Sequence, residues 1–501
     1  MIQRLISLLT YNPKEPLIFS SGLFLILFLG FSFVYMLLRH QLRPRLLFVT
    51  LFSYYFYYKS SGLYFFLLAV VTVSDFFIAR RIHRLDEQVS TAEMRKGIDR
   101  QRKWLVALSL LIDLGLLGYF KYTNFFAGMI SQMIGHNFRP WDIFLPVGIS
   151  FFTFQSMSYT IDVYRRKLKP LPHLLDYAFY VSFFPQLVAG PIVRASDFAP
   201  QISKPVIITK DMFARGVYFI IIGLFKKAVI SDYISLNFVD RIFDNAMLYS
   251  GLENLLGVYG YAMQIYCDFS GYSDMAIGIA LLLGFHFPLN FNAPYRATSI
   301  TDFWRRWHIS LSSWIRDYIY ISLGGNRKGK FRQYVNLIVT MLLGGLWHGA
   351  SLNFIAWGGM HGLALAAHKF FSQDILHHER GYQSHGLRKF VAVVLTFHFV
   401  CFTWIFFRHS SFEAGWAMIS RIFTNFHAEL WMQIVSGYKY VLAFMAFGFL
   451  THFLPDSWQE TMIGSLRRCN VVVYALLITA VIYIVIQVKS STIQPFIYFQ
   501  F

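Results

Sequence analysis

Charged side chains are scarce in this sequence. Only 14% of the 501 residues are Asp, Glu, Lys or Arg, whereas 56% are hydrophobic, and the mean hydropathy is +0.47. A soluble chain of this length normally carries roughly 25% charged residues and divides into several domains. The shortage of charge therefore excludes an ordinary soluble protein.

Cysteine is also rare. The three cysteines, Cys267, Cys401 and Cys469, are scattered in or beside apolar runs. Their spacing predicts neither a disulfide framework nor a metal site, so we interpret them as small buried hydrophobic side chains. A cleavable signal peptide is not evident, because the first apolar run is long enough to span a bilayer.

Acidic residues are the scarcer of the two signs, 26 against 45 Lys and Arg, which gives a net charge of +19. In a soluble protein this excess would suggest nucleic-acid binding. Here the basic residues concentrate in alternate loops, as they do in the cytoplasmic loops of membrane proteins. The basic loops are 39–45, 80–103 and 163–173, and the segments 1–16, 59–62 and 121–142 between them hold few basic residues. The pattern predicts cytoplasmic basic loops, an N-terminus on the other side and no nucleic-acid binding.

What the sequence has in abundance is apolar runs of about twenty residues, the length that crosses a bilayer core of roughly 30 Å. The candidate spans are 17–38, 43–58, 62–79, 104–121, 143–161, 174–190, 213–232, 254–285, 352–371, 388–407, 438–454 and 470–488. Backbone exposed to lipid must satisfy its hydrogen bonds within a helix. We therefore predict an all-α polytopic membrane protein, with about 11–13 transmembrane or re-entrant helices in a single domain over residues 1–501.

One aromatic and basic stretch, FWRRWHISLSSWIRDYIYISLGGNRKG (303–329), interrupts this pattern. Ser299 and Asp302 fit a capping box, which predicts a helix beginning near residue 300. At helical spacing, the residues that form an apolar stripe are Phe303, Trp307, Leu311, Trp314, Ile315, Tyr318 and Ile319, and a second face holds Arg305, His308, Ser312 and Arg316. This is typical of an amphipathic helix in the interface plane with its Trp and Tyr at headgroup depth. The stretch LGGNRKGK (323–330) predicts a basic turn on the cytoplasmic side.

The stretch GGLWHGASLNFIAWGGMHG (344–362) places His348 in an apolar, glycine-dense segment. Its glycines would let a helix or a ligand approach the backbone closely. An ionisable residue in a membrane is a functional candidate, although a neutral His bonded to a neighbouring helix is the alternative. The second histidine, His308, favours a functional site, whereas we interpret His361 and His368 as packing or helix-pairing residues.

Three further polar groups leave alternatives open. Arg305, Arg306, Arg316, Arg327, Lys328 and Lys330 are either interfacial anchors or a site for a phosphate-bearing ligand. The stretch YCDFSGYSD (266–274) indicates a network between helices or a cavity wall, and we favour the network. The stretch HHERGYQSH (377–385) is a solvated loop rather than a metal site. The residues alone therefore fit an enzyme with an anionic donor or a transporter with a proton-linked His.

The two stretches around His308 and His348 resemble the membrane-bound O-acyltransferase family, in its bacterial branch of alginate O-acetylation proteins. Further stretches that resemble this branch are PVGISFFTFQSMSYTIDVYRR (146–166), LVAGPIVR (187–194), YCDFSGYSDMAIGIALLLGF (266–285), NFNAPYRATSITDFWRRWHISLS (290–312) and PFIYFQF (495–501). The resemblance has its motif core at about 146–371. It implies a ring of helices around a thin centre, with a tunnel that joins a cytoplasmic donor to an acceptor on the other face.

The resemblance also implies roles for single residues. The family's near-invariant histidine falls on His348, and its second active-site position falls on His308. Arg305, Arg316 and Asn292 are the candidate donor-binding residues, and we expect no metal site. Acyl transfer to a hydroxyl needs a base, and imidazole suits this because its pKa lies near the working pH.

The resemblance predicts an O-acetyltransferase of the bacterial cytoplasmic membrane that uses cytosolic acetyl-CoA to acetylate an extracytoplasmic polysaccharide or peptidoglycan. A partner with a Ser-His-Asp site is expected to make the final transfer, because no such soluble domain is found in the sequence. D-alanyl transfer to teichoic acid from a carrier protein is a close alternative, although the C-terminal extension favours the acetylating branch. A polysaccharide or lipid transporter is the other, although no inverted repeat is seen.

Overall fold

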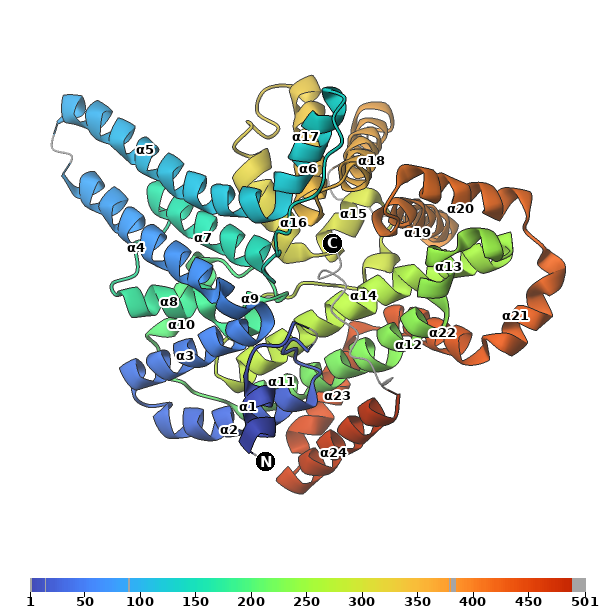
Figure 1. The fold of residues 1–501 in the computed structure, drawn as a ribbon, viewed down its shortest axis with the longest axis horizontal. Helices are drawn as coiled ribbons and strands as arrows, with labels where there is room; N and C mark the ends of the chain where they lie inside the picture. Colours follow the sequence, from blue (N-terminus) through green and yellow to red (C-terminus); the bar gives the residue numbers. More distant parts are fainter. Residues whose placement is uncertain (1, 14, 89–90, 378, 380–383, 489–501) are drawn as a thin grey trace. The chain divides into compact units, whose positions relative to one another are not determined.

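The computed structural model describes residues 2–13, 15–88, 91–377, 379 and 384–488. Within these ranges the secondary structure is helical throughout, without a strand (Figure 1). The prediction of an all-α polytopic membrane protein is confirmed. The stretch 495–501, one of those that carry the family resemblance, lies outside the described residues, as does most of 377–385.

The chain divides into two compact units. One comprises Met1–Gly216 and Ala276–Pro288, and the other comprises Val217–Met275 and Leu289–Phe501. The helices of the first unit are α1 (Ile2–Leu9), α2 (Gly22–Leu38), α3 (Leu42–Ser61), α4 (Phe65–Glu87), α5 (Ala92–Leu117), α6 (Thr123–Met133), α7 (Ile149–Tyr164), α8 (Leu174–Ser182), α9 (Phe184–Leu187) and α10 (Ala195–Ile202). Helices α11 (Lys210–Leu224) and α14 (Gly251–Leu282) contribute residues to both units.

The second unit contains the remaining helices. They are α12 (Asp232–Ile234), α13 (Asp240–Asp244), α15 (Ile300–Arg306), α16 (Ile309–Ile315), α17 (Lys330–His348), α18 (Leu352–Lys369), α19 (Gly386–Arg408), α20 (Phe412–Thr424), α21 (Trp431–Gly437), α22 (Lys439–His452), α23 (Asp456–Arg468) and α24 (Val471–Val488). Several of them continue into π-helical turns, among them η3 (Phe225–Ser231) after α11 and η7 (Arg316–Tyr320) after α16.

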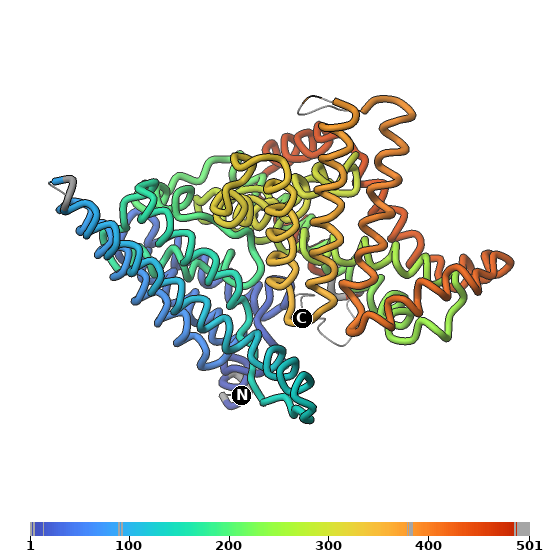
Figure 2. The backbone as a smooth tube through the Cα atoms, turned by 90° about the horizontal axis from the view of Figure 1, so that it is seen from above, coloured from blue at the N-terminus to red at the C-terminus, as the bar shows by residue number. Residues whose placement is uncertain are grey.

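In the first unit, the long helices α4 and α5 lie side by side (Figures 1 and 2). Their contact is partly polar, since the Ser109 hydroxyl of α5 donates to the Asp75 carboxylate of α4 at 2.7 Å. The Ser156 hydroxyl of α7 also donates to Asp75 and lies 2.7 Å from the Tyr177 hydroxyl of α8. Because a buried carboxylate is costly without hydrogen bonds, this cluster fixes four helices to one another.

In the second unit, two lysines of η3 pair with carboxylates of α14. Lys226 lies 2.7 Å from Asp274, and Lys227 lies 2.6 Å from Asp268. The backbones come close here, because a Cβ atom on Gly223 would lie 2.5 Å from the Gly271 carbonyl oxygen. The prediction that 266–274 forms a network between helices is confirmed.

Among the residues that the structure describes, three helical stretches are long and apolar enough to cross a membrane: Leu42–Glu87, Met94–Met133 and Gly386–Arg408. The pair Ala428–Gly437 and Lys439–His452, bent by 94°, adds a fourth if it is one broken span. Gly22–Leu38 and Val471–Ile484 are shorter apolar helices. The predicted spans are more numerous because some of them combine a short helix with a turn of another kind: 213–232, for example, is α11 followed by η3.

Candidate active site

A helical hairpin positions His348. Helices α17 and α18 lie side by side (Figure 2) and are joined by a loop of three residues. His348 is the last residue of α17, directly before this loop. A Cβ atom on Gly345 would lie 2.1 Å from the Phe354 carbonyl oxygen, and one on Gly358 would lie 2.2 Å from that of Met341. The prediction that these glycines allow close helix approach is confirmed, and the contact of the two backbones fixes the end of α17.

Aromatic rings enclose His348, whose exposed fraction is 3%. Its ring centroid lies 5.0 Å from that of Trp347, 5.1 Å from Trp357 and 5.5 Å from Phe407, each in an edge-to-face arrangement. Such an environment excludes water and strengthens electrostatic interactions within it. A reaction at His348 would therefore be protected from hydrolysis of the acyl donor.

His308 lies at a break between two helices. It has a left-handed backbone conformation (φ 44°, ψ 55°), after α15 ends at Arg306 and before α16 begins at Ile309. The Ile309 N–H donates to the Asn290 carbonyl at 2.9 Å, and the Asn292 N–H donates to the Arg306 carbonyl at 2.9 Å. The segment 290–292 thus forms backbone hydrogen bonds with the residues on both sides of the break.

This break corrects the prediction of one amphipathic helix across the stretch. The predicted start is confirmed, because α15 begins at Ile300 and the Ser299 hydroxyl accepts the Asp302 N–H at 3.2 Å. The predicted apolar stripe is buried from Phe303 to Tyr318, and Arg305 and Arg316 of the predicted polar face are exposed. His308 is the exception, because the prediction placed it on the polar face and the structure buries it fully. The left-handed backbone of His308 interrupts the helix at this position, so its side chain does not lie on the polar face that one continuous helix would give it.

Polar and aromatic groups both contact His308. Its Nδ1 lies 3.2 Å from the Asn290 Oδ1, and its ring centroid lies 4.7 Å from that of Phe269 on α14. Trp347 contacts both histidines, because its ring centroid lies 6.1 Å from that of His308 and 5.0 Å from that of His348. Burial lowers the pKa of His308 to about 3, so this imidazole is neutral near pH 7.

The three candidate donor-binding residues lie on consecutive elements and are all exposed. Arg305 lies on α15, Asn292 precedes that helix, and Arg316 begins η7. The guanidinium of Arg316 donates to both carboxylate oxygens of Asp317, at 2.7 and 3.2 Å. A ligand phosphate would therefore compete with Asp317 for Arg316.

His361 has a structural environment, as predicted. The Trp304 indole N–H of α15 donates to its Nδ1 at 3.3 Å, and its Nε2 lies 3.0 Å from the Thr403 hydroxyl of α19. His361 therefore joins three helices. His368 is half-buried, with its Nδ1 3.3 Å from the Thr301 hydroxyl.

A cavity of about 840 Å³ opens at the end of α19. Its lining residues are Phe243, Asp244, Asn245, Ala246, Met247, Leu248, Ser351, Phe354, Phe407, Arg408, His409, Ser410, Ala414 and Ala417. Phe407 belongs to both places, because it lines the cavity and contacts the His348 ring. The cavity therefore ends one aromatic ring away from His348.

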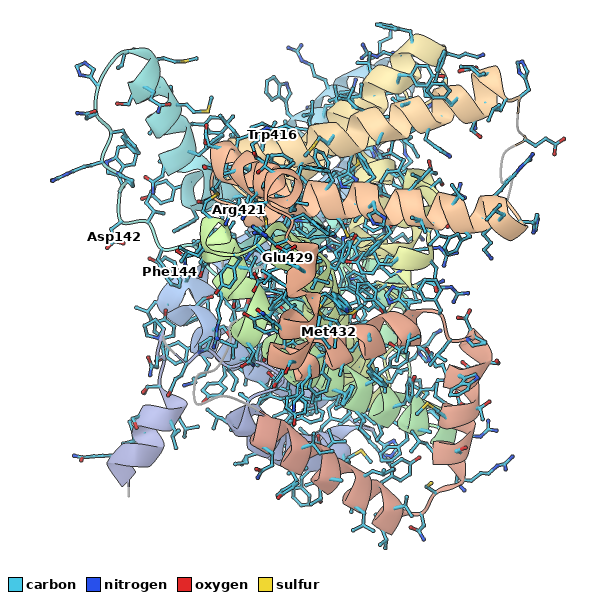
Figure 3. All side chains as sticks on the ribbon, turned by 90° about the vertical axis from the view of Figure 1, so that its right-hand side faces the viewer. Asp142, Phe144, Trp416, Arg421, Glu429 and Met432 are labelled. Atoms are coloured by element: carbon cyan, nitrogen blue, oxygen red, sulfur yellow. The ribbon has the colours of Figure 1, made fainter. Side chains whose placement is uncertain are left out.

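The cavity wall is held by polar contacts around α20. Arg408 lies 3.2 Å from Asp240 and 3.8 Å from Asp244. Burial, and then the positive charge of Arg408, lowers the pKa of His409 to about 4. Trp416 and Arg421 lie on α20 (Figure 3). Neither lines the cavity, and the Arg421 guanidinium connects α20 to the neighbouring segment by donating to the Tyr249 carbonyl at 2.9 Å. The wall thus offers hydrogen-bonding groups and a paired charge.

Sequence reasoning missed the residues that connect the two histidines to their surroundings. Asn290, Ser310 and Trp347 were not among the predicted site residues, although all three lie in the stretches that carry the resemblance. An amide side chain in an apolar run is the signal that the sequence offers for Asn290. In the structure its exposed fraction is 0%.

Comparison with known proteins gives the family. The profile of the membrane-bound O-acyltransferase family matches residues 163–377. A probable alginate O-acetylase AlgI of Pseudomonas aeruginosa is 40% identical over 413 residues, which are 81% of this chain and 75% of that protein. The chain belongs to the membrane-bound O-acyltransferase family.

Other members of this O-acyltransferase family are similarly close. A probable alginate O-acetylase AlgI of Pseudomonas putida is 36% identical over 97% of this chain and 100% of its own length. A peptidoglycan O-acetyltransferase of Helicobacter pylori is 38% identical over 80% of this chain and 78% of its own length. The predicted resemblance is confirmed, and the protein is a membrane O-acyltransferase.

Proposed function

We propose that this O-acyltransferase moves acetyl groups from cytosolic acetyl-CoA across the bacterial cytoplasmic membrane, for O-acetylation of an extracytoplasmic polysaccharide or peptidoglycan. The observation that carries the proposal is the pair of buried histidines, His308 and His348, with Trp347 in contact with both. The relatives named as an alginate O-acetylase and a peptidoglycan O-acetyltransferase support acetyl transfer to an envelope polymer.

The proposed chemistry is acyl transfer to a hydroxyl. His348 accepts the hydroxyl proton, the oxygen attacks the thioester carbonyl, and the carbon–sulfur bond breaks. The proton then passes from the imidazolium to the leaving thiolate, which regenerates the neutral base. His308, neutral because it is buried, contributes a hydrogen-bonding nitrogen to the same enclosure. The aromatic rings around His348 support this assignment, since they protect the thioester from water.

The cavity at the end of α19 is the proposed acceptor side. It is bounded toward His348 by Phe407, and its wall carries Arg408, His409 and Asn245, which suit a hydroxyl-rich acceptor. We propose that the acceptor is a sugar hydroxyl, or the active-site serine of a Ser-His-Asp partner protein that completes the transfer outside.

The exposed residues Asn292, Arg305 and Arg316 form the proposed donor side. An Arg fork suits the phosphates of coenzyme A, and charge-assisted hydrogen bonds are stronger than neutral ones. Because Arg316 is paired with Asp317, Arg305 is the better placed of the two for a ligand.

The decisive experiment substitutes His348. We expect His348→Gln to abolish acetylation of the surface polymer while the protein still inserts and accumulates. Gln keeps much of the side-chain volume and hydrogen bonding but accepts no proton near neutral pH. The acetyl content of the polymer is measured and normalised to membrane-embedded protein.

His361→Gln is the matched control, because His361 is equally buried but joins helices. His361→Gln should lower the free energy of unfolding by about 0.6–2 kcal/mol per lost hydrogen bond. The amount of protein in the membrane should therefore fall more than the activity per molecule. Near-normal acetylation by His348→Gln would exclude proton transfer at this residue. Incorporation of labelled D-alanine from a carrier protein, with none of labelled acetate, would favour the teichoic acid alternative.

A further inference from the structure

Asn290 is fully buried beside His308 and makes hydrogen bonds on both sides of its amide. Its Nδ2 donates to the Ser273 hydroxyl of α14 at 3.1 Å. Its Oδ1 accepts the Ser310 N–H at 3.2 Å and the Ser310 hydroxyl at 2.8 Å. The His308 Nδ1 lies 3.2 Å from the same oxygen. One amide therefore connects α14, the helix break and the His308 ring.

The orientation of this amide is fixed by a backbone group. A backbone N–H only donates, so the atom of Asn290 that faces the Ser310 N–H must be the oxygen. An amide rotated by 180° would direct its NH₂ at that N–H and leave both donors without an acceptor. The Ser273 hydroxyl accepts on the opposite side, which is consistent with the same orientation.

The orientation of the amide determines the proton position on His308. A carbonyl oxygen only accepts, so the His308 Nδ1 must carry the hydrogen that lies between them. The Ser310 hydroxyl gives its proton to the Asn290 Oδ1, at 2.8 Å, rather than to Nδ1, which is 3.5 Å away. In a neutral imidazole with a proton on Nδ1, the lone pair is on Nε2.

We infer that Asn290 is a positioning residue that holds His308 as the Nδ1–H tautomer, so that Nε2 is the atom that accepts a hydrogen bond from the substrate. The tautomer follows from the hydrogen bonds alone, and only its use by a substrate rests on the proposed function. The backbone supports the assignment, because the Asn290 carbonyl also accepts the Ile309 N–H at 2.9 Å. Asn290 thus holds both the ring and the left-handed turn that directs it.

His361 provides an internal reference with the opposite tautomer. The Trp304 indole N–H donates to the His361 Nδ1, which must therefore carry the lone pair. Its Nε2–H then donates to the Thr403 hydroxyl, whose own proton goes to the Val400 carbonyl at 2.8 Å. His308 and His361 should therefore give opposite patterns in one measurement.

The test is ¹⁵N solid-state NMR of the full-length protein in lipid nanodiscs, with ¹⁵N-labelled histidine. The chain has 16 histidines, so the signals of His308 and His361 are assigned by their loss in His308→Asn and His361→Gln. We expect a protonated, pyrrole-type Nδ1 and an unprotonated, pyridine-type Nε2 for His308, and the reverse for His361. A pyridine-type Nδ1 in His308 would overturn the inference, whatever the activity.

Two variants of Asn290 test its role in turnover. Asn290→Leu removes the acceptor and should lower kcat by about 10²-fold or more, by analogy with loss of the correct tautomer in other imidazole-dependent enzymes, with a smaller change in the donor KM. Asn290→Asp keeps an acceptor for Nδ1–H and should retain the tautomer and rescue part of the turnover. Its added carboxylate should raise the pKa of His308, so that activity gains an acidic limb.

Ser273→Ala is the matched control. It removes the bond on the nitrogen side of the amide and leaves the oxygen side intact, so the tautomer signals should not change. Equal losses in Asn290→Leu and Asn290→Asp, with no change in the pH profile of Asn290→Asp, would overturn the positioning role. A fully active His308→Asn with the expected wild-type tautomer would instead refute the proposed function of His308 and leave the tautomer assignment standing.

Discussion

At the scale of single residues, His308 and His348 are buried in different ways. His348 is enclosed by the rings of Trp347, Trp357 and Phe407, whereas His308 is bonded to a buried amide. The first environment suits a group that changes its protonation state in a dry site. The second suits a group whose proton position is fixed before the substrate arrives.

The burial of His308 predicts a pH dependence of stability. Its pKa is about 3 in the folded protein, against 6.5 for an exposed histidine in an unfolded chain. Below pH 6.5 the unfolded chain binds a proton at His308, whereas the folded chain does not until the pH approaches 3. The free energy of unfolding is therefore unaffected by His308 above pH 6.5 and decreases as the pH falls toward 3. Thermal unfolding in detergent should therefore show a steeper loss of stability between pH 7 and 4.5 in the wild type than in His308→Asn. Parallel curves would contradict it.

The donor side predicts a difference between two arginines. Arg305→Ala should raise the donor KM about ten-fold or more, because a lost charge-assisted hydrogen bond costs roughly 1.5–3 kcal/mol. Arg316→Ala should have the smaller effect, since Arg316 is already bonded to Asp317. Steady-state kinetics with acetyl-CoA measures both, and Arg305→Lys should rescue only in part, because Lys lacks the planar fork. Unchanged donor KM in both Ala variants would make them interfacial anchors.

Residue identities were therefore easier to predict than residue environments. The glycines indicated the close backbone approach around His348, and the histidine itself indicated a functional candidate, because small residues and an ionisable group are informative in an apolar run. The helix α17 that carries His348 was not among the predicted spans. The bonding partners of Asn290 could not be predicted, because its contacts with Ser273 and Ser310 join segments that are separate in sequence.

At the scale of helices, close backbone contact and a helix break position the site. The capping box predicted the start of α15 correctly, because a cap is a local hydrogen bond. The break after Arg306 was not predicted, because the bonds that stabilise it come from the distant segment 290–292. Periodicity therefore located a helix and did not reveal its end.

The α17–α18 contact predicts unequal effects of alanine at two neighbouring glycines. Gly358→Ala should destabilise the protein by about 1–3 kcal/mol, because its Cβ would lie 2.2 Å from the Met341 carbonyl oxygen and the backbones must separate. Gly359→Ala is the control, since its Cβ would lie 3.3 Å from a flexible Leu342 methyl group. The unfolding temperature and the acetylation of the polymer should both decrease in Gly358→Ala and not in Gly359→Ala. Equal behaviour of the two variants would exclude tight backbone packing.

At the scale of the whole molecule, the charge distribution and the family membership lead to one expectation of sidedness. Basic segments predict which residues face the cytoplasm, and in the structure Arg95, in the first turn of α5, and Lys167, after the end of α7, are both exposed. The all-α class could be predicted from composition, because lipid permits few other backbones. The division into two compact units could not, since it depends on contacts between distant segments.

Cysteine labelling tests this sidedness. In a Cys469→Ser background, which retains the buried Cys267 and Cys401, an introduced cysteine at Asn137 should react with an impermeant maleimide added to intact cells. Cysteines at Arg95 and Lys167 should react only after the cells are opened, because these loops are basic. Strong labelling of Arg95→Cys from outside would reverse the topology.

The left-handed backbone of His308 also decides which amino acids a saturation library can place at position 308. A non-glycine residue in this conformation carries a strain of about 1–2 kcal/mol, least for Asn and Asp and greatest for β-branched side chains. Variants with Val, Ile or Thr at position 308 should therefore accumulate poorly. Variants with Asn or Gly should accumulate normally, so that their activity measures the loss of the imidazole alone. Asparagine, rather than alanine, is thus the appropriate control substitution for this histidine, because it removes the imidazole and tolerates the left-handed backbone.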